Sequence, residues 1–193
     1  SLHDALPICT VVIMPRWDRE LAGRLISRHR VNNWTCIPTM IIDLFGSPNY
    51  KSFDLSSLRY LSGGGAAMPH AVAERLQKEF GLTFAEGYGL TETAAPSHAN
   101  PPERAKLQCL GMPIFGVDSR VVDPVTLLEL PPGEVGEIQL QASNLMRGYH
   151  RLPAEAGFVD GWYATGDLRA VTCGRQHCFD LLRIMFIRLM RTE

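Results

Sequence analysis

The sequence lacks an excess of charge of either sign. Its 193 residues include 19 Lys and Arg and 20 Asp and Glu, which gives a formal net charge of -1 at pH 7. Proteins that attract nucleic acid or anionic membranes through general electrostatics carry a basic excess. We therefore expect neither nucleic acid nor a membrane surface as a partner, and we expect small molecules or other proteins instead.

The sequence also lacks several features of exported and membrane-embedded proteins. No apolar run reaches the length of about 20 residues that spans a bilayer, and Ser1–Ile8 has neither the basic nor the apolar region of a secretory signal. The five cysteines are odd in number and scattered, which does not indicate a disulfide framework. Cys173, His177 and Cys178 are zinc-ligand types, but no second pair lies nearby, so we expect no zinc site. These absences favour the cytoplasm.

What the sequence does contain is an alternation of β-branched runs and amphipathic segments. Strands are expected at Cys9–Met14, Asn33–Ile37, Arg59–Ser62 and Leu82–Ala85. Helices are expected from Asp18, whose side chain can cap the first turn, to about His29, over Thr39–Phe45 with Pro38 in the first turn, and over Pro69–Phe80. The first strand is a continuous apolar run, as in a strand buried on both faces. Repeated strand–helix alternation predicts an α/β fold with a mainly parallel sheet flanked by helices, which binds ligands at the carboxyl ends of its strands.

After about Asn100, short β segments separated by Pro and Gly turns replace this alternation. Val117–Val122 and Val135–Leu140 are two of the expected strands. The pattern predicts a small β-rich subdomain with the form of a distorted barrel. We place the α/β subdomain at residues 9–104 and the β-rich subdomain at residues 105–168.

The stretch Glu86–Thr93, E-G-Y-G-L-T-E-T, follows the last expected strand of the α/β part. Its two glycines let the main chain of a turn approach a flat or anionic group, and Tyr88 between them offers a ring for stacking. Thr91 offers a hydroxyl, and Glu92 offers the hard oxygen that Mg²⁺ prefers. Together these properties suit a magnesium nucleotide. An ordinary strand–turn–helix junction with Thr91 as its N-cap is the alternative.

Two further segments offer groups for the same ligand. Gly63-Gly64-Gly65 ends the expected strand before Tyr88, and it could form the other wall of a slot for a flat ring. A plain loop is the alternative, and the spacing does not fit a dinucleotide-binding fingerprint, which disfavours a Rossmann dehydrogenase. Asp167 follows a Thr-Gly pair, where its carboxylate can accept hydrogen bonds from two neighbouring sugar hydroxyls. An Asx turn is the alternative there.

Four segments in this order resemble the adenylate-forming, or AMP-binding, superfamily of acyl-CoA synthetases, luciferases and peptide-synthetase adenylation domains. They are G-G-G-A-A-M-P (63–69), E-G-Y-G-L-T-E-T (86–93), G-E-I-Q-L-Q-A-S-N-L-M-R-G-Y (136–149) and W-Y-A-T-G-D-L (162–168). The resemblance covers about residues 9–168. Within the superfamily, segments such as Ile37–Met40 and His98–Pro102 are most similar to bacterial fatty acid–CoA ligases.

The resemblance implies a two-step reaction. A carboxylic acid and MgATP give an acyl-adenylate and pyrophosphate, and the thiolate of coenzyme A then displaces AMP. The matched positions imply that Tyr88 packs on adenine, Asp167 holds the ribose, Thr91 contacts phosphate and Glu92 binds Mg²⁺, so Thr91 and Glu92 are the implied catalytic residues. The implied nucleotide-binding residues are Gly64, Gly65, Ala66, Glu86, Gly87, Tyr88, Gly89, Thr91 and Asp167.

The sequence departs from the family at both ends. The phosphate loop is absent, residues 1–8 form a leader unlike the family, and residues 169–193 replace the lysine-bearing C-terminal domain. None of Lys51, Lys78 and Lys106 stands in the position of the catalytic lysine. Phe179–Met190 has the pattern of a short basic helix, for which a membrane surface is an open alternative. We expect a central fragment of an acyl-CoA synthetase, with a non-catalytic nucleotide- or acyl-binding module and an inactive truncated product as alternatives.

Overall fold

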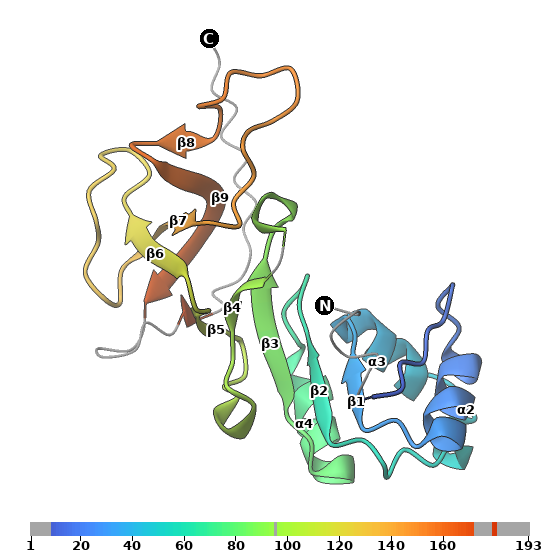
Figure 1. Ribbon diagram of the computed structural model, residues 1–193. Helices are drawn as coiled ribbons and strands as arrows, with labels where there is room; N and C mark the ends of the chain where they lie inside the picture. Colours follow the sequence, from blue (N-terminus) through green and yellow to red (C-terminus); the bar gives the residue numbers. More distant parts are fainter. Residues whose placement is uncertain (1–8, 95, 172–178, 181–193) are drawn as a thin grey trace. The chain divides into compact units, whose positions relative to one another are not determined.

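The structure, a computed structural model, describes residues 9–94, 96–171 and the backbone of 179–180. It divides into two compact units, residues 1–84 (unit 1) and residues 85–193 (unit 2), and each is described by itself. Figure 1 shows their elements. Among the helices of the described residues, none combines the length and the apolar character that a membrane crossing needs.

Unit 1, in its described part, pairs two parallel strands and surrounds them with helices. The elements are α2 (Arg19–His29), β1 (Asn33–Thr35), α3 (Pro38–Phe45), a 3-10 turn at Tyr50–Ser52, β2 (Tyr60–Gly63) and α4 (His70–Phe80). In the parallel register Trp34 lies opposite Leu61. The buried residues include Ile41, Leu44, Leu61, Met68, Leu76 and Phe84. The α/β fold class is therefore confirmed, with helices that begin and end close to the predicted residues.

Helix α2 begins where a side chain satisfies its first turn. The carboxylate of Asp18 accepts a hydrogen bond of 2.7 Å from the backbone N–H of Leu21, and Asp18 has the extended backbone of an N-cap. The apolar side chains of Ala22 and Ile26 are buried one turn apart. The predicted cap and the predicted helix are therefore confirmed, and both depend on residues that are close together in the sequence.

Asp18→Ala is expected to destabilise α2 by about 1 kcal/mol, because the Leu21 N–H loses its acceptor. Asp18→Asn keeps an oxygen in the same place and should cost only a few tenths of that amount. Amide hydrogen exchange in the first turn of α2 measures both effects. Equal losses in the two variants would show that the capping bond contributes nothing.

The predicted strand at Cys9–Met14 is wrong. The segment is irregular in the structure and pairs with no strand of the described residues. Val11 is 37% exposed and Ile13 is 70% exposed, so the apolar run is not buried on both faces. β-Branched composition predicts a strand only where neighbouring strands supply hydrogen bonds and cover, and the described residues of unit 1 supply neither here.

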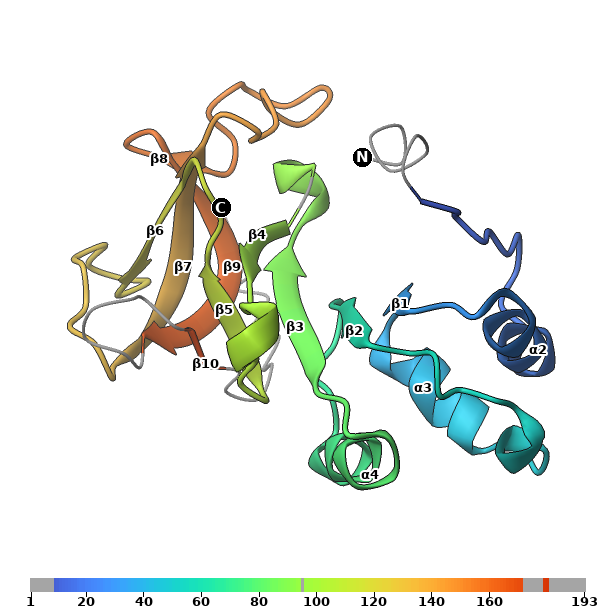
Figure 2. The ribbon, with the colours of Figure 1, turned by 60° about the horizontal axis from the view of Figure 1, so that its bottom comes forward.

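Unit 2 is an antiparallel β structure. Its strands are β3 (Phe84–Gly89, whose first residue closes unit 1), β4 (Pro96–Ala99), β5 (Cys109–Pro113), β6 (Val117–Val122), β7 (Val135–Ala142), β8 (Phe158–Val159), β9 (Trp162–Val171) and β10 (Phe179–Asp180), with 3-10 turns at Thr91–Thr93 and Pro102–Arg104. The strand order is β3-β4-β5-β10-β9-β7-β6, and β8 pairs with β9. Figure 2 shows the curl of β6, β7 and β9. The predicted β-rich subdomain is confirmed.

The core of unit 2 lies inside this curl. Its buried members are Leu110, Val117, Val121, Ile138, Leu140 and Val171, and the partly buried Tyr88 and Leu145 pack against them. Tyr88 therefore stands at the border between the core and the outside of unit 2. The packing holds this side chain firmly while part of it stays exposed.

The two units divide between Phe84 and Ala85, earlier in the chain than the predicted subdomain boundary at residue 104. The antiparallel pair of β4 and β5 joins a strand before residue 104 to a strand after it, with Ala99 opposite Met112. The division into residues 9–104 and 105–168 stays a prediction about subdomains.

The predicted tail is only partly described. Strand β9 continues through Val171, and Phe179–Asp180 forms the short strand β10, so the proposed helix does not begin at Phe179. The remainder of that helix, the residues Cys173, His177 and Cys178, and the predicted leader at residues 1–8 lie outside the described residues.

Candidate functional site

The glycine-rich motif is a strand for longer than the sequence predicted. Residues 86–89 lie within β3, where Gly87 is opposite Ala99 and Tyr88 is opposite His98 in β4. The chain leaves the strand only at the 3-10 turn Thr91–Thr93. The prediction that the glycines themselves form the turn is therefore wrong, because pairing with β4 holds them extended.

Tyr88 and Asp167 meet in unit 2, although they lie 79 positions apart in the sequence. The hydroxyl of Tyr88 donates a hydrogen bond of 2.6 Å to Oδ2 of Asp167. Burial raises the pKa of Tyr88, and the Asp167 carboxylate raises it further. The phenol therefore stays protonated and donates to the carboxylate at neutral pH. Two of the predicted nucleotide-binding residues thus form one polar group.

Asp167 projects from a bulge in β9. Gln139 pairs with Ala164 and Glu137 pairs with Leu168, so three residues of β9, 165–167, lie opposite the single residue Ile138 of β7. The sequence predicted a turn at this Thr-Gly pair. The structure instead keeps the segment in the sheet and accommodates the extra residues as a local irregularity, which re-aims a side chain.

Hydrogen bonds fix the shape of this bulge. The Thr165 hydroxyl donates to the carbonyl of Ile138 at 2.8 Å and accepts from the Asp167 N–H at 3.1 Å. The Gly166 N–H donates to the Glu137 carboxylate at 2.9 Å, and Gly166 has a φ of 74°, which favours glycine. The backbone that carries the Asp167 carboxylate is therefore rigidly placed.

His98 supports the Tyr88 ring from β4. It is fully buried, and the two ring centroids are 5.8 Å apart with a tilt of 55°. Its Nδ1 lies 3.0 Å from the hydroxyl of Ser97, and its Nε2 lies 3.2 Å from the hydroxyl of Ser119. Burial lowers the pKa of His98 to about 4, so the neutral ring serves packing and hydrogen bonding. No role for His98 was predicted, because its contacts with Tyr88 and Ser119 join residues of separate strands.

The turn at Thr91–Thr93 presents two of the predicted site residues. Thr91 is exposed and Glu92 is partly exposed. Thr91 is not an N-cap: the hydroxyl of Thr93 accepts the hydrogen bond from the Leu90 N–H, at 2.9 Å. The Thr91 hydroxyl and the Glu92 carboxylate are thus on a short, capped turn at the end of β3.

The segment Asn144–Tyr149 holds this turn in place. The Met146 N–H donates to the Glu92 carbonyl at 2.7 Å, and the Asn144 side chain donates to the Thr93 carbonyl at 2.7 Å. The Tyr149 hydroxyl donates to Oε1 of Glu92 at 2.9 Å. No role was predicted for these residues, although the segment belongs to the motif at residues 136–149, which resembles the family.

The Glu92 carboxylate also affects the titration of its partner. The Tyr163 hydroxyl lowers the pKa of Tyr149, but burial and the nearby Glu92 carboxylate together raise it more. The net pKa of Tyr149 lies above its usual value. The phenol is therefore a proton donor to Glu92 at neutral pH.

Gly64, Gly65 and Ala66 lie in unit 1, in the loop between β2 and α4. A Cβ on the preceding Gly63 would lie 1.7 Å from the carbonyl oxygen of Cys36, so close packing explains that glycine. Gly65 has a φ of 81° and is exposed with Ala66. That these residues border the nucleotide of Tyr88 and Asp167 stays a prediction.

Unit 1 also has a surface cavity of about 420 Å³. Its lining consists of Tyr50, Lys51, Phe53, Leu55, Glu79 and Phe80. None of these is a predicted site residue, so the cavity does not identify the motif site.

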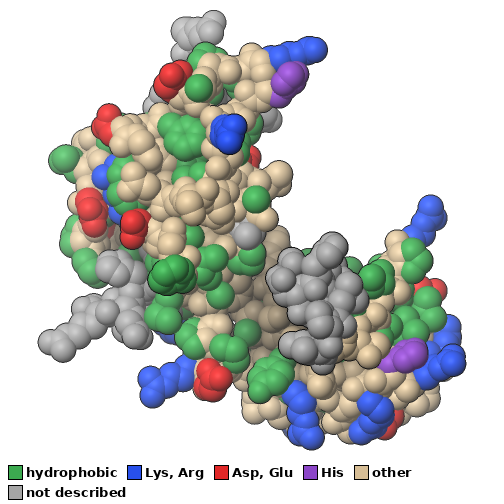
Figure 3. All heavy atoms as spheres, in the orientation of Figure 1, with side chains coloured by type: hydrophobic (Ala, Val, Ile, Leu, Met, Phe, Trp, Pro, Cys, Tyr) green, Lys and Arg blue, Asp and Glu red, His purple; other side chains and the backbone are tan. Residues whose placement is uncertain are grey.

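The described residues offer no preformed metal cage, because they contain no cluster of three His, Cys, Asp or Glu side chains. Mg²⁺ commonly binds through one or two carboxylates together with water and substrate phosphates. The single Glu92 carboxylate fits that donor set. In the view of Figure 3, basic and acidic side chains are interspersed over unit 2 and form no one-sign patch on this face.

Known proteins are similar to this chain in sequence and in fold. The family model described as "AMP-binding enzyme" matches residues 8–150. A feruloyl-CoA synthase from an Amycolatopsis species is 37% identical over 186 residues, which are 92% of the chain and 37% of the relative. The long-chain-fatty-acid–CoA ligase of Bacillus subtilis (strain 168) is 32% identical over 161 residues, which are 82% of the chain and 29% of the relative.

A solved structure shows the same fold. ATP-bound MatB from Rhodopseudomonas palustris matches with a TM-score of 0.77 and 28% sequence identity, over 87% of the chain and 33% of that protein. The chain therefore spans about a third of the length of the relatives that it matches.

Proposed function

Because the chain belongs to the family of AMP-binding enzymes, we propose that it forms part of the nucleotide site of an ATP-dependent acid–thiol ligase. Its relatives include a feruloyl-CoA synthase and a long-chain-fatty-acid–CoA ligase. In the proposed reaction a carboxylic acid is activated as an acyl-adenylate, and coenzyme A then displaces AMP. The predicted fatty acid and an aromatic acid are both supported by these relatives.

The contact between Tyr88 and Asp167 carries this proposal. It joins the E-G-Y-G-L-T-E-T motif and the W-Y-A-T-G-D-L motif within one unit. A carboxylate on a rigid bulge can accept two hydrogen bonds from neighbouring ribose hydroxyls. The ring beside it offers a face to adenine. This pairing supports the proposal that Asp167 binds the ribose and that Tyr88 and residues 86–89 contact the adenine.

The turn after β3 would receive the phosphates. The exposed Thr91 hydroxyl can donate to a phosphate oxygen, and Glu92 is the carboxylate that would hold Mg²⁺ there. When bound, Mg²⁺ would neutralise the charge of the phosphates and make attack on them easier. Glu92 would hold the cation beside the phosphates, while Thr91 would bind a phosphate and Asp167 would bind the ribose.

Asp167→Ala is expected to weaken AMP binding by at least about 10-fold, because each hydrogen bond to a charged group contributes about 1.5–3 kcal/mol. Isothermal titration calorimetry of the 193-residue chain with AMP measures this loss. Asp167→Asn keeps an acceptor for Tyr88 and should lose less affinity. Asp118→Ala removes an exposed carboxylate from β6 of the same unit and should bind AMP like the unchanged chain. Equal affinity in Asp167→Ala and Asp118→Ala would contradict the assignment.

A second candidate function is non-catalytic binding of a nucleotide or an acyl group by this chain alone. The contact between Tyr88 and Asp167 would serve nucleotide binding without any reaction, which favours this candidate. Pyrophosphate release from ATP and a carboxylic acid separates the two: AMP binding without release supports the binding module. An inactive product would show neither. Coenzyme A as co-substrate and a cytoplasmic location remain parts of the proposal.

A further inference from the structure

The Tyr149 hydroxyl forms a hydrogen bond with Glu92, the side chain of the turn that is proposed to hold a metal. This hydroxyl donates to Oε1 of Glu92 at 2.9 Å and lies 3.0 Å from the hydroxyl of Tyr163. The three groups form a chain that runs from β9 through the loop after β7 to the turn after β3. Tyr149 is 38% exposed and Glu92 is partly exposed, so this series of hydrogen bonds reaches the surface of unit 2.

The two tyrosine rings pack against a glycine position that leaves little room for a side chain. A Cβ on Gly157 would lie 3.2 Å from the Tyr163 ring and 3.4 Å from the Tyr149 ring, and Gly157 has a φ of 89°. Tyr163 is buried and packs edge-on against Phe158, with ring centroids 5.5 Å apart. The Tyr149 hydroxyl is therefore aimed by packing, and it can hold its partner in one orientation.

The Tyr149 bond is not needed to hold the backbone of the turn. The Glu92 carbonyl already accepts from the Met146 N–H at 2.7 Å, and the Thr93 carbonyl accepts from Asn144 at 2.7 Å. What the Tyr149 hydroxyl adds is a restraint on the carboxylate of Glu92 alone. A restraint of this kind sets which carboxylate oxygen faces a ligand.

We propose that Tyr149 is a positioning residue: it holds Oε1 of Glu92 and leaves Oε2 to a divalent cation that is bound with the nucleotide phosphates. The inference rests on the proposed function, because the metal role of Glu92 is part of it. It adds a residue, Tyr149, and a supporting pair, Tyr163 and Gly157, to the site. The contribution of Tyr149 is to metal affinity and not to the affinity for adenosine.

Tyr149→Phe tests this inference, because it removes the hydroxyl and keeps the ring on Gly157. The measurement is Mn²⁺ affinity, by electron paramagnetic resonance, of the chain saturated with a non-hydrolysable ATP analogue. Loss of such a supporting bond weakens metal binding by about 10-fold or more. Metal-free AMP binding by calorimetry should stay within about twofold of the unchanged chain, since the Tyr88 and Asp167 contact is untouched.

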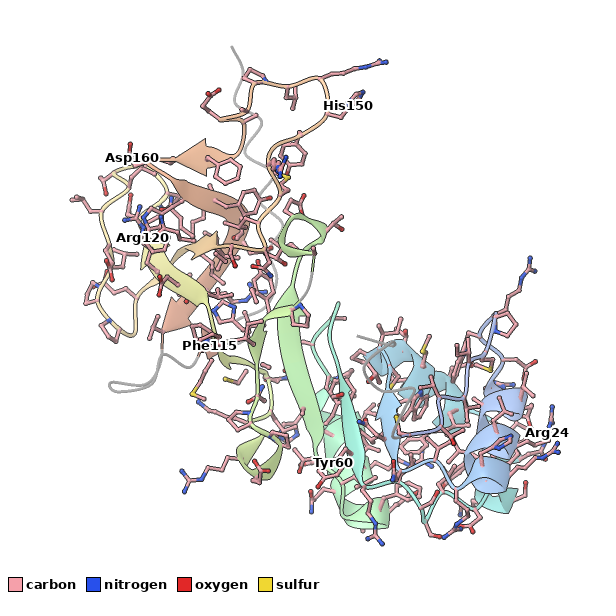
Figure 4. The ribbon with its side chains drawn as sticks, viewed as in Figure 1. Arg24, Tyr60, Phe115, Arg120, His150 and Asp160 are labelled. Carbon is pink, nitrogen blue, oxygen red and sulfur yellow. The ribbon has the colours of Figure 1, made fainter. Side chains whose placement is uncertain are left out.

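Matched variants separate positioning from folding. Tyr60→Phe removes a phenol that is 58% exposed in unit 1 and projects from β2 (Figure 4), and it should leave Mn²⁺ affinity unchanged. Tyr163→Phe should weaken Mn²⁺ less than Tyr149→Phe, because Tyr163 reaches Glu92 only through Tyr149.

Unchanged Mn²⁺ affinity in Tyr149→Phe overturns the inference. In that case AMP binding by the unchanged chain would still support the proposed function. A parallel loss of Mn²⁺ and AMP affinity also overturns it, since the residue would then only stabilise the unit. If the unchanged chain binds no AMP, the proposed function fails and the inference fails with it.

Discussion

Gly111→Ala is expected to prevent unit 2 from folding. Gly111 has a φ of 91°, and a Cβ there would lie 2.1 Å from the carbonyl carbon and oxygen of Ala99 and 2.4 Å from the backbone nitrogen of Asn100. These are backbone atoms of the neighbouring chain segment, so no side chain can rotate away. The expected cost exceeds about 4 kcal/mol, which is close to the whole stability of a small domain, about 5–15 kcal/mol.

Gly116→Ala is the matched control for this substitution. Gly116 has a φ of 81°, but a Cβ there would meet no atom within 4 Å. It therefore carries only the backbone strain of the left-handed region, about 1–2 kcal/mol. Denaturant unfolding followed by circular dichroism, together with amide exchange in β4 and β5, measures both variants. If the two lose the same stability, the close approach of Gly111 to β4 does not matter.

The Gly111 contact also matters for the site. Ala99 follows His98 in β4, and the His98 ring packs on Tyr88. Displacement of β4 would remove the support behind the proposed adenine ring. AMP binding should therefore be lost together with folding in Gly111→Ala and kept in Gly116→Ala.

Acidification from about pH 6.5 to about pH 4 is expected to destabilise unit 2 by up to about 3 kcal/mol through His98. Burial lowers the pKa of His98 from 6.5 to about 4 in the folded state. In this pH range His98 binds a proton in the unfolded state but not in the folded state, so the free energy of unfolding falls as the pH falls. The stability is fully present above the unfolded pKa and is lost as the pH falls through the folded pKa.

Unfolding by urea at a series of pH values measures this dependence. His98→Gln removes the titrating ring, so its stability should fall less between pH 6.5 and pH 4, although it starts lower because the packing on Tyr88 changes. His150→Gln removes an exposed histidine from the loop between β7 and β8, labelled in Figure 4, and should keep the unchanged slope. A slope in His98→Gln as steep as in the unchanged chain would assign the pH dependence to other groups.

The sequence predicted those parts of the fold whose signals are short-range. The cap at Asp18 and the proline at the start of α3 both act within one helical turn. The predicted strand at Cys9–Met14 failed because its burial depends on partners elsewhere in the fold. Hydrophobic composition states that a segment prefers cover, but it does not state that cover is present.

The same distinction applies to the candidate site. Tyr88 and Asp167 were predicted because each lies in a recognisable motif, and the structure adds that they touch. Tyr149 and His98 had no predicted role because their hydrogen-bond partners are distant in the sequence. The partner of Tyr149 is Glu92, 57 positions away, and a partner of His98 is Ser119, 21 positions away. A single sequence does not show which strands are neighbours, so these partners followed only from the fold.

The bulge at residues 165–167 limits how the length of this chain segment can change. Its two additional residues keep the in-and-out alternation of β9 in phase with β7 on both sides, from Tyr163 opposite Leu140 to Ala170 opposite Val135. Deleting one residue would put the strand out of phase. The side chain of Val171, which belongs to the core of unit 2, would then point to the opposite face of the sheet. Changes of length should therefore be tolerated here only in pairs, which makes the motif a fixed spacer as well as a carrier of the carboxylate.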